Sequence, residues 1–220
     1  MSDLPLSLIF VAIFVGGMII ALVTSAKRLK TSGYHLRALG TQLNLDVIGG
    51  EPFFKSIPWL AFITKPIRID GVYRDAPVKV WHFSRGSGRS STPYIGLKMQ
   101  ISNPRGLSFQ FSKEGFFSKV GKTLGMQDIE VGDTRFDRTF IVKCSDPYFI
   151  RTALLPEIKE KFYHAFEELG ARGTIKLESS EIYYEESGRI RSEKVRERFA
   201  ALIGLCADLR DTVSVYSEQT

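Results

Sequence analysis

The sequence predicts an α+β protein in which an N-terminal transmembrane helix precedes an antiparallel-sheet domain with a long C-terminal helix. An uncharged apolar run covers residues 6–23, short segments alternate in polarity from residue 67 onward, and residues 192–213 repeat apolar side chains at helical spacing. We therefore divide the chain into three parts, namely a transmembrane anchor (1–30), a helical and aromatic membrane-proximal linker (31–66) and a cytoplasmic α+β domain (67–220).

The first segment is long enough to cross a bilayer. Residues 6–23 read LSLIFVAIFVGGMIIALV, and with their flanks they give roughly 23 residues, or about 35 Å of helix. A lone span must be helical because its backbone finds no hydrogen-bond partner in lipid. Gly16 and Gly17 have no side chains, so they leave a flat surface on which another helix can pack. The residues expected in the membrane are Leu6, Ile9, Phe10, Ile13, Phe14, Gly16, Gly17, Ile20 and Leu22.

Basic residues follow the apolar run and none precedes it. Residues 1–5 contain one acid, Asp3, whereas the flank after the run contains Lys27, Arg28, Lys30 and Arg37. By the positive-inside rule, the N-terminus lies outside and the rest of the chain lies in the cytoplasm. The main alternative is a cleaved signal peptide with a small-residue site at 24–26, but the basic residues that normally begin such a peptide are missing.

The charge of the chain is unevenly distributed. The 220 residues include 30 Lys/Arg and 24 Asp/Glu, a net charge of +6; residues 1–122 hold 16 of the basic and 6 of the acidic residues. A basic half beside the bilayer attracts anionic headgroups by about 1 kcal/mol per nearby side chain, although such charges also simply solvate a surface. Nucleic-acid binding is not expected, because the basic residues are dispersed and match no known motif.

The membrane-proximal linker begins as a helix and ends in an aromatic segment. We expect a helix over 27–45, broken near Gly33, with Leu36, Leu39 and Leu43 on one apolar stripe. Residues 53–66 (FFKSIPWLAFITKP) are too short to span a bilayer, so they pack on the core or lie at the membrane interface. The expected membrane-surface contacts are Lys27, Arg28, Lys30, Arg37, Phe53, Phe54 and Trp59.

A two-residue period predicts the sheet. Segments 67–73 and 78–83 form a hairpin, and 94–101 with 107–111 extend it to a meander of about four antiparallel strands. Two further short strands and a late hairpin are expected at 129–131, 139–143, 174–178 and 182–185.

Three helices are predicted after residue 145. Asp146 and Pro147 supply a cap and a first-turn proline, and Pro156 starts a second helix that stops at Gly170. A long amphipathic helix over 192–213 makes Cys206 a core thiol; its apolar face consists of Val195, Phe199, Leu202, Ile203, Cys206, Leu209 and Val213.

No motif indicates a catalytic, cofactor or metal site. Residues 115–123 nearly match a phosphate loop, but five residues separate the glycines where the motif has four. The three histidines and two cysteines follow no ligand spacing, and no nucleophile motif is present. We therefore expect no enzyme activity, no cofactor and no metal, and we identify no small-molecule substrate.

The most distinctive segment is 132–142, GDTRFDRTFIV. Its aspartates could form an acid pair for metal or acid–base chemistry, but the neighbouring arginines would compete with a cation. We favour a structural role in which Asp133 caps a turn, Phe136 and Phe140 enter the core, and Asp137 pairs with an arginine at a strand edge. The residues of this structural motif are Gly132, Asp133, Phe136, Asp137, Arg138 and Phe140.

This segment resembles a Gly-Asp-x-x-Phe-Asp-Arg-x-Phe-x-Val motif of bacterial single-span membrane proteins of unknown function. Those proteins also have a Ser/Asp-Pro helix start and a Leu-Leu-x-Pro-Glu step; here these are 146–147 and, without the spacer, 154–157. The resemblance covers about residues 36–215. It implies a protein of the bacterial inner membrane and brings no catalytic residue.

We expect a non-enzymatic, membrane-anchored accessory subunit that holds or stabilises a membrane protein complex at the cytoplasmic face. Its partners would be membrane lipids and integral membrane protein subunits. The plan resembles accessory subunits of photosynthetic and respiratory complexes, such as the H subunit of purple-bacterial reaction centres, in architecture alone. The alternatives are a peripheral module that binds anionic lipid and an unrecognised enzyme that uses Asp133, Asp137 or His82.

Overall fold

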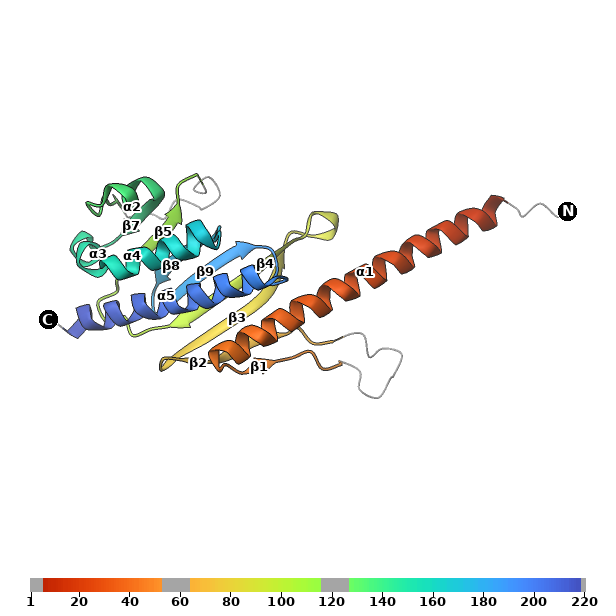
Figure 1. The fold of residues 1–220 in the computed structure, drawn as a ribbon, viewed down its shortest axis with the longest axis horizontal. Coiled ribbons are helices and arrows are strands. Elements are labelled where there is room, and N and C mark those ends of the chain that lie inside the picture. The colour runs from red at the N-terminus through yellow and green to blue at the C-terminus, as the bar shows by residue number, and fades with distance from the viewer. Residues whose placement is uncertain (1–5, 53–63, 116–126, 219–220) are drawn as a thin grey trace.

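The computed structural model describes residues 6–52, 64–115 and 127–218, and it shows an α+β fold (Figure 1). Helix α1 (Leu6–Leu43) runs from the N-terminal end into the domain, where it packs beside the C-terminal helix α5 (Glu193–Glu218). The predicted antiparallel sheet and long C-terminal helix are therefore confirmed. Among the residues that are described, no helix combines the length and hydropathy of a membrane span.

Helix α1 continues through Gly33, so the break expected there is wrong. A Cβ on Gly33 would lie 2.7 Å from the Cδ1 of Ile67. The close approach of Ile67, and not a bend in the helix, accounts for a glycine at this position. Leu36 and Leu39 are fully buried and Leu43 packs against the same core, which confirms the apolar stripe. The C-terminal part of α1 is thus built into the domain.

The described strands form one sheet in which every pair of neighbours is antiparallel. Their order is β1-β2-β3-β4-β9-β8-β5-β7-β6. In chain order the strands are β1 (Val47–Ile48), β2 (Arg68–Tyr73), β3 (Ala76–Arg85), β4 (Thr92–Gln100), β5 (Phe109–Lys113), β6 (Gln127–Asp128), β7 (Phe140–Cys144), β8 (Thr174–Glu178) and β9 (Glu181–Ser187).

The predicted four-strand meander is wrong at its last step. β4 pairs with β9 (Leu97 opposite Tyr184), whereas β5 pairs with β8 (Phe111 opposite Ile175). The late hairpin therefore separates β4 from β5. Alternating polarity identifies strands but not their partners, because the partners come from distant parts of the chain.

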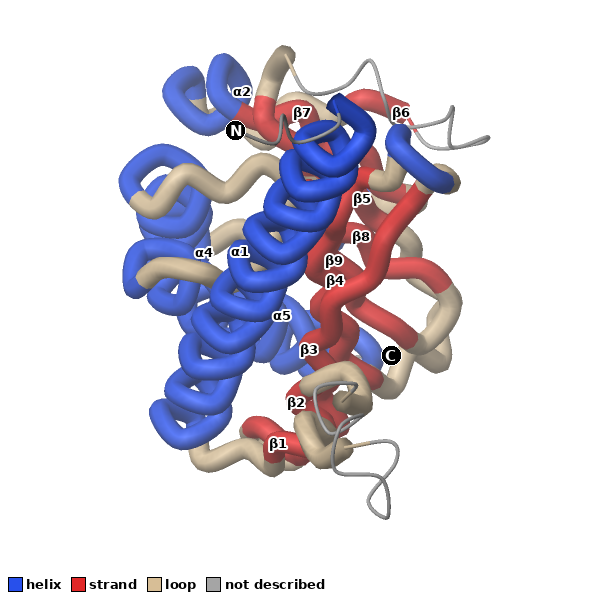
Figure 2. The backbone as a smooth tube through the Cα atoms, turned by 90° about the vertical axis from the view of Figure 1, so that its right-hand side faces the viewer, coloured by secondary structure: helices blue, strands red, loops and turns tan. Residues whose placement is uncertain are grey.

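Helices cover one face of the sheet: α1, α4 and α5 lie together on one side of it (Figure 2). The shorter helices are α2 (Thr134–Thr139), α3 (Pro147–Ala153) and α4 (Pro156–Tyr163), and a π-helical turn (His164–Glu168) continues α4. The helices expected to begin at 146–147 and at Pro156 are confirmed. A short 3-10 turn (Gly88–Ser90) lies in the β3–β4 loop.

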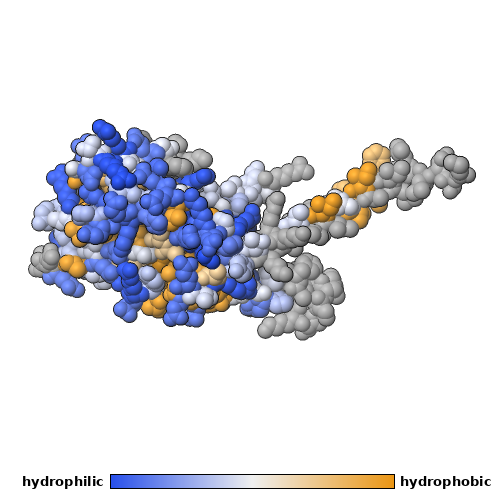
Figure 3. Space-filling view, in the orientation of Figure 1, coloured by the Kyte–Doolittle hydropathy of each residue, from blue (hydrophilic) through white to orange (hydrophobic). Residues whose placement is uncertain are grey.

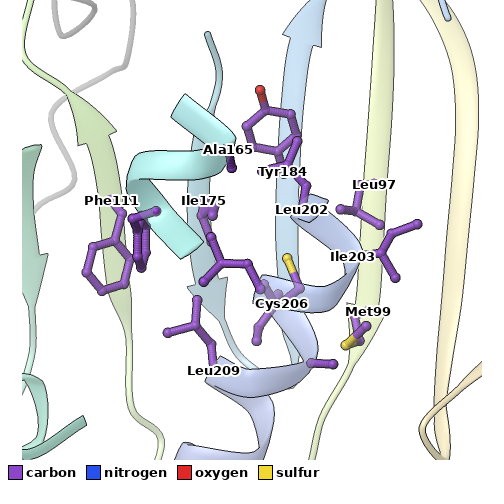
Figure 4. Close-up of a cluster of buried hydrophobic side chains, with 14 of the residues drawn as sticks. Leu97, Met99, Phe111, Ala165, Ile175, Tyr184, Leu202, Ile203, Cys206 and Leu209 are labelled. Carbon is purple, nitrogen blue, oxygen red and sulfur yellow. The ribbon is translucent and has the colours of Figure 1, made fainter. Parts of the chain in front are cut away.

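The core lies between the inner face of the sheet and the apolar face of α5 (Figure 4). On α5, Phe199, Leu202, Ile203 and Cys206 are fully buried, as the helical spacing predicts. They meet inward side chains of the central strands, among them Leu97, Met99, Ile175 and Tyr184.

Smaller differences concern the segment before the distinctive motif. The strand expected at 129–131 is replaced by β6 at 127–128, and the Ile129 amide still donates to the Val142 carbonyl at 2.9 Å. Helix α2 was not anticipated. Residues 53–63 and 116–126 lie outside the described ranges. The first of these segments contains the expected membrane-surface contacts Phe53, Phe54 and Trp59, and the second contains most of the segment that nearly matches a phosphate loop.

Candidate membrane-proximal site

The N-terminal part of α1 extends beyond the domain with its apolar side chains uncovered (Figures 1 and 3). Apart from the helix's own backbone, no described atom lies within 4 Å of a Cβ placed on Gly16 or Gly17. The side chains of Leu6, Ile9 and Leu22 lie outside the description. The predicted anchor residues whose exposure is known are Phe10 (66%), Ile13 (67%), Phe14 (74%) and Ile20 (66%).

A cavity of about 420 Å³ lies where α1 enters the domain. We call it the junction cavity. Its walls come from α1, the segment 64–67 before β2, the end of β3, and the connection between β9 and α5; Gly33, Pro66, Ile67 and Phe83 line it without polar side chains. Its polar lining consists of Ser32, Thr64, Lys65, His82, Ser84 and Arg189, and no carboxylate is among the described lining residues.

Backbone contacts hold the segment 64–67 against the end of the first sheet strand. The Gly50 amide donates to the Lys65 carbonyl at 3.0 Å, and the Lys65 amide donates to the Glu51 carbonyl at 2.9 Å. Gly49 has φ +94°, and a Cβ there would lie 2.1 Å from the Pro66 carbonyl oxygen, so only glycine fits. The Lys65 ammonium is 2.9 Å from the Glu51 carboxylate and is already paired.

His82 links β3 to the connection between β9 and α5 through a hydrogen bond. Its Nε2 accepts a hydrogen bond from the Ile190 amide at 3.2 Å, and Ile190 is fully buried. Burial, and then the positive charges of Arg189 and Arg191, lower the pKa of His82 from 6.5 to about 4. The imidazole is therefore neutral at physiological pH, and because Nε2 is the acceptor we assign the proton to Nδ1.

Two arginines flank the buried Ile190 and carry uncompensated charge. Neither Arg189 nor Arg191 forms an ion pair with any residue within the described ranges. Burial and the neighbouring charge of Arg191 lower the pKa of Arg189. A guanidinium nevertheless remains protonated in proteins, so the cavity contains a partly buried cation that has no counter-ion among the residues of the described ranges.

Ser32 contributes an unused hydrogen-bonding group. The residue is 3% exposed, and its Oγ has no hydrogen-bond partner in the described structure. A buried hydroxyl normally finds a partner, so this position needs an explanation.

Among the predicted surface residues, only Arg37 has a described side chain. It is exposed. A Cβ on Gly50 would lie 2.5 Å from the Nη2 of Arg37, which places the guanidinium beside Gly50. The side chains of Lys27, Arg28 and Lys30 lie outside the description. The sequence named His82 as a candidate for the enzyme alternative alone, and it did not single out Ser32 or Arg189. The one available signal for this site was a pair of arginines in a short connection without acids, GRIRS.

The aspartates of the distinctive motif hold backbone in place. Asp133 caps α2: its Oδ1 accepts from the amides of Arg135 and Phe136, both at 3.1 Å, and Lys159 lies 3.0 Å from its Oδ2. The Phe136 amide and then Lys159 lower the pKa of Asp133. Asp137 accepts from the amides of Val131 (2.8 Å) and Gly132 (3.1 Å), so the expected arginine pairing is wrong.

The aromatic residues of the motif pack in the core. Phe136 is fully buried and Phe140 is 2% exposed, and their ring centroids are 4.7 Å apart. Both rings lie against Phe162 of α4 at 5.5 Å. The contacts of the carboxylates and of the phenylalanines are those of a local scaffold.

Within the described ranges, the structure shows neither an activated thiol nor a group of metal ligands. Burial raises the pKa of Cys144 to about 11 and that of Cys206 to about 12, so both thiols are protonated at neutral pH. Within the described ranges, no three His, Cys, Asp or Glu side chains are grouped closely enough to hold a metal ion.

Comparison with known protein families and with curated proteins finds no match. Among solved structures, the chain is similar to the crystal structure of the mycobacterial trehalose monomycolate transport factor A, TtfA. The TM-score is 0.49 at 10% sequence identity, and the match covers 83% of this chain and 94% of that one.

Proposed function

We propose that this protein is a non-enzymatic, membrane-anchored accessory subunit that holds or stabilises a membrane protein complex. The observation that carries the proposal is the course of α1. One uninterrupted helix, Leu6–Leu43, has exposed apolar side chains at its start and fully buried ones, Leu36 and Leu39, near its end.

This course gives the domain a fixed position relative to the apolar segment. The helix contains 38 residues, or about 57 Å at 1.5 Å per residue. Because it enters the core without an intervening loop, the domain cannot swing as it would on a flexible linker. A rigid connection suits a subunit that positions a partner beside the bilayer.

The exposed glycines support contact with another span. Glycine costs a helix about 1 kcal/mol relative to alanine, and α1 contains two in succession, Gly16 and Gly17, with no described side chain packed on them. Small residues let helix backbones approach closely in lipid. We therefore place a transmembrane helix of the partner against this part of α1.

The orientation follows from charge. Basic residues after the apolar run, Lys27, Arg28, Lys30 and Arg37, favour a domain in the cytoplasm with the N-terminus outside. The resemblance of segment 132–142 to the motif of bacterial single-span proteins implies that the membrane is the bacterial inner membrane. The contacts of Asp133 and Asp137 do not favour the enzyme alternative, because both carboxylates already accept hydrogen bonds from backbone amides.

Purification of the full-length protein in a mild detergent tests the proposal. We expect it in a high-mass complex with an integral membrane protein, which mass spectrometry would identify. Replacing Gly16 and Gly17 by leucine should release the partner because the close approach is lost. Val11→Leu, at a position that is 57% exposed, is the matched control and should retain the complex.

Two results would contradict the proposal. A protein that elutes as a lone monomer in every mild detergent has no such partner. A C-terminal reporter that is active only in the periplasm would place the domain on the wrong side of the membrane.

A further inference from the structure

We propose that the junction cavity is a binding site for a phosphate group. The site is independent of the accessory role: it concerns a ligand of the domain rather than the partner of α1. Arg189 would bind the phosphate through its guanidinium, with Ser32 Oγ and the Nδ1–H of His82 as neutral donors.

The charge balance of the cavity favours an anion. Its described lining holds two cations and no carboxylate. Lys65 is already paired with Glu51, so Arg189 is the cation left to bind a ligand. The planar fork of a guanidinium matches two phosphate oxygens, and such charge-assisted hydrogen bonds are about twice as strong as neutral ones.

Two neutral hydrogen-bond donors of the cavity, on Ser32 and His82, have no partner assigned within the described fold, and a phosphate would give each of them one. The Oγ of Ser32 is buried without a described partner, and a phosphate oxygen would supply one. His82 uses Nε2 to accept from Ile190, which leaves the Nδ1–H as a donor. Ser32, His82 and Arg189 line the same cavity, although these three residues come from three separate parts of the chain.

The size and place of the cavity fit a phosphate ester better than a bare ion. A volume of about 420 Å³ lies in the usual range for small-molecule sites. Ser32 lies nine residues after the end of the apolar run, or about 14 Å along the helix. In a membrane-anchored protein the cavity would therefore lie beside the headgroup layer. Phosphate could come from a lipid headgroup or from a soluble ester, and the chemistry is the same for both.

Thermal unfolding of the full-length protein provides the test. The probes are inorganic phosphate at constant ionic strength in mild detergent, and nanodiscs of phosphatidylcholine alone or mixed with phosphatidylglycerol. We expect inorganic phosphate or the phosphatidylglycerol nanodiscs to raise the midpoint. Stabilisation by both probes would point to a site open to soluble esters, whereas stabilisation by the anionic nanodiscs alone would identify a lipid headgroup.

Three variants identify the site. Arg189→Gln should weaken the apparent phosphate affinity about tenfold, the value of one charge-assisted contact. Ser32→Ala should weaken it about threefold or more, yet the phosphate-free variant should unfold at the same or a higher temperature, because the removed hydroxyl has no described partner. Arg151→Gln makes the same charge change at an exposed position of α3 and should leave the affinity unchanged.

Several outcomes would overturn the site. If neither probe shifts the midpoint, the cavity binds no phosphate. If Arg151→Gln weakens binding as much as Arg189→Gln does, the effect is general electrostatics. Should Arg189→Gln fold poorly, an unchanged affinity in Ser32→Ala would still reject the proposal. None of these results affects the topology or the complex, so the two proposals fail separately.

Discussion

Arg198 and Glu186 form an ion pair that joins α5 to β9 inside the domain. The Nη1 of Arg198 lies 2.7 Å from the Oε1 of Glu186, and the two side chains are 13% and 3% exposed. The other carboxylate oxygen accepts from the Tyr184 hydroxyl at 2.6 Å and from the Arg172 amide at 3.1 Å. The Nε of Arg198 donates to the Leu169 carbonyl at 2.8 Å. One buried charge pair thus connects the long helix, the hairpin strand and the end of the α4 helical segment.

Removing one partner of this pair should destabilise the fold strongly. Arg198→Met leaves the Glu186 carboxylate buried without its counter-ion, and we expect a loss of about 3–5 kcal/mol in the free energy of unfolding. Chemical denaturation of the full-length protein in mild detergent measures it. Arg196→Met on the same helix is the control: its partner, Glu193, is 70% exposed, so the loss of that ion pair should cost less than about 1 kcal/mol. Equal losses in the two variants would show that burial does not set the value of the pair.

The half-buried His82 should make the domain less stable in mild acid. Its folded-state pKa, about 4, lies below the ordinary 6.5 because of burial first and then Arg189 and Arg191. Between these values the unfolded chain binds a proton that the folded chain does not. The contribution of His82 to the free energy of unfolding should therefore decrease as the pH falls from 6.5 toward 4, by up to about 3 kcal/mol, and this contribution should stay constant below pH 4.

Denaturation at a series of pH values measures this slope. His82→Gln keeps an acceptor for the Ile190 amide and should flatten the curve in that window. His164→Gln removes an exposed imidazole that lies 2.7 Å from Glu168 and should retain the slope. A wild-type curve that is flat between pH 6.5 and 4 would contradict the prediction.

Two glycines of the domain should respond to alanine in opposite directions. A Cβ on Gly173 would lie 2.0 Å from the Glu185 carbonyl oxygen and 2.6 Å from the Tyr184 ring, so Gly173→Ala should cost about 1–3 kcal/mol through forced backbone movement. Gly204 lies within α5, and apart from the backbone of that helix no described atom is within 4 Å of its Cβ position, so Gly204→Ala should gain about 0.5–1 kcal/mol from helix propensity. Thermal midpoints of the two variants, measured side by side, would reveal the prediction as wrong if their order were reversed.

The local patterns of the chain predicted most elements. The buried face of α5 and the stripe of Leu36 and Leu39 follow from a three-to-four residue period, which depends only on neighbours along one helix. The cap at Asp146 is equally local: its Oδ1 accepts from the amides of Tyr148 and Phe149, two and three residues later. Helix α2 was missed, because a single turn of helix shows no apolar period to distinguish it from a capped turn.

By itself, the sequence determined that an uncharged apolar helix precedes an α+β domain, because hydropathy and side-chain period are properties of contiguous residues. The tertiary structure decided which strands are neighbours, with the hairpin of β8 and β9 inserted between β4 and β5. It also decided that Ser32, His82 and Arg189 line one cavity. Strand pairing and cavity formation depend on contacts between residues far apart in the chain, and no local pattern encodes them.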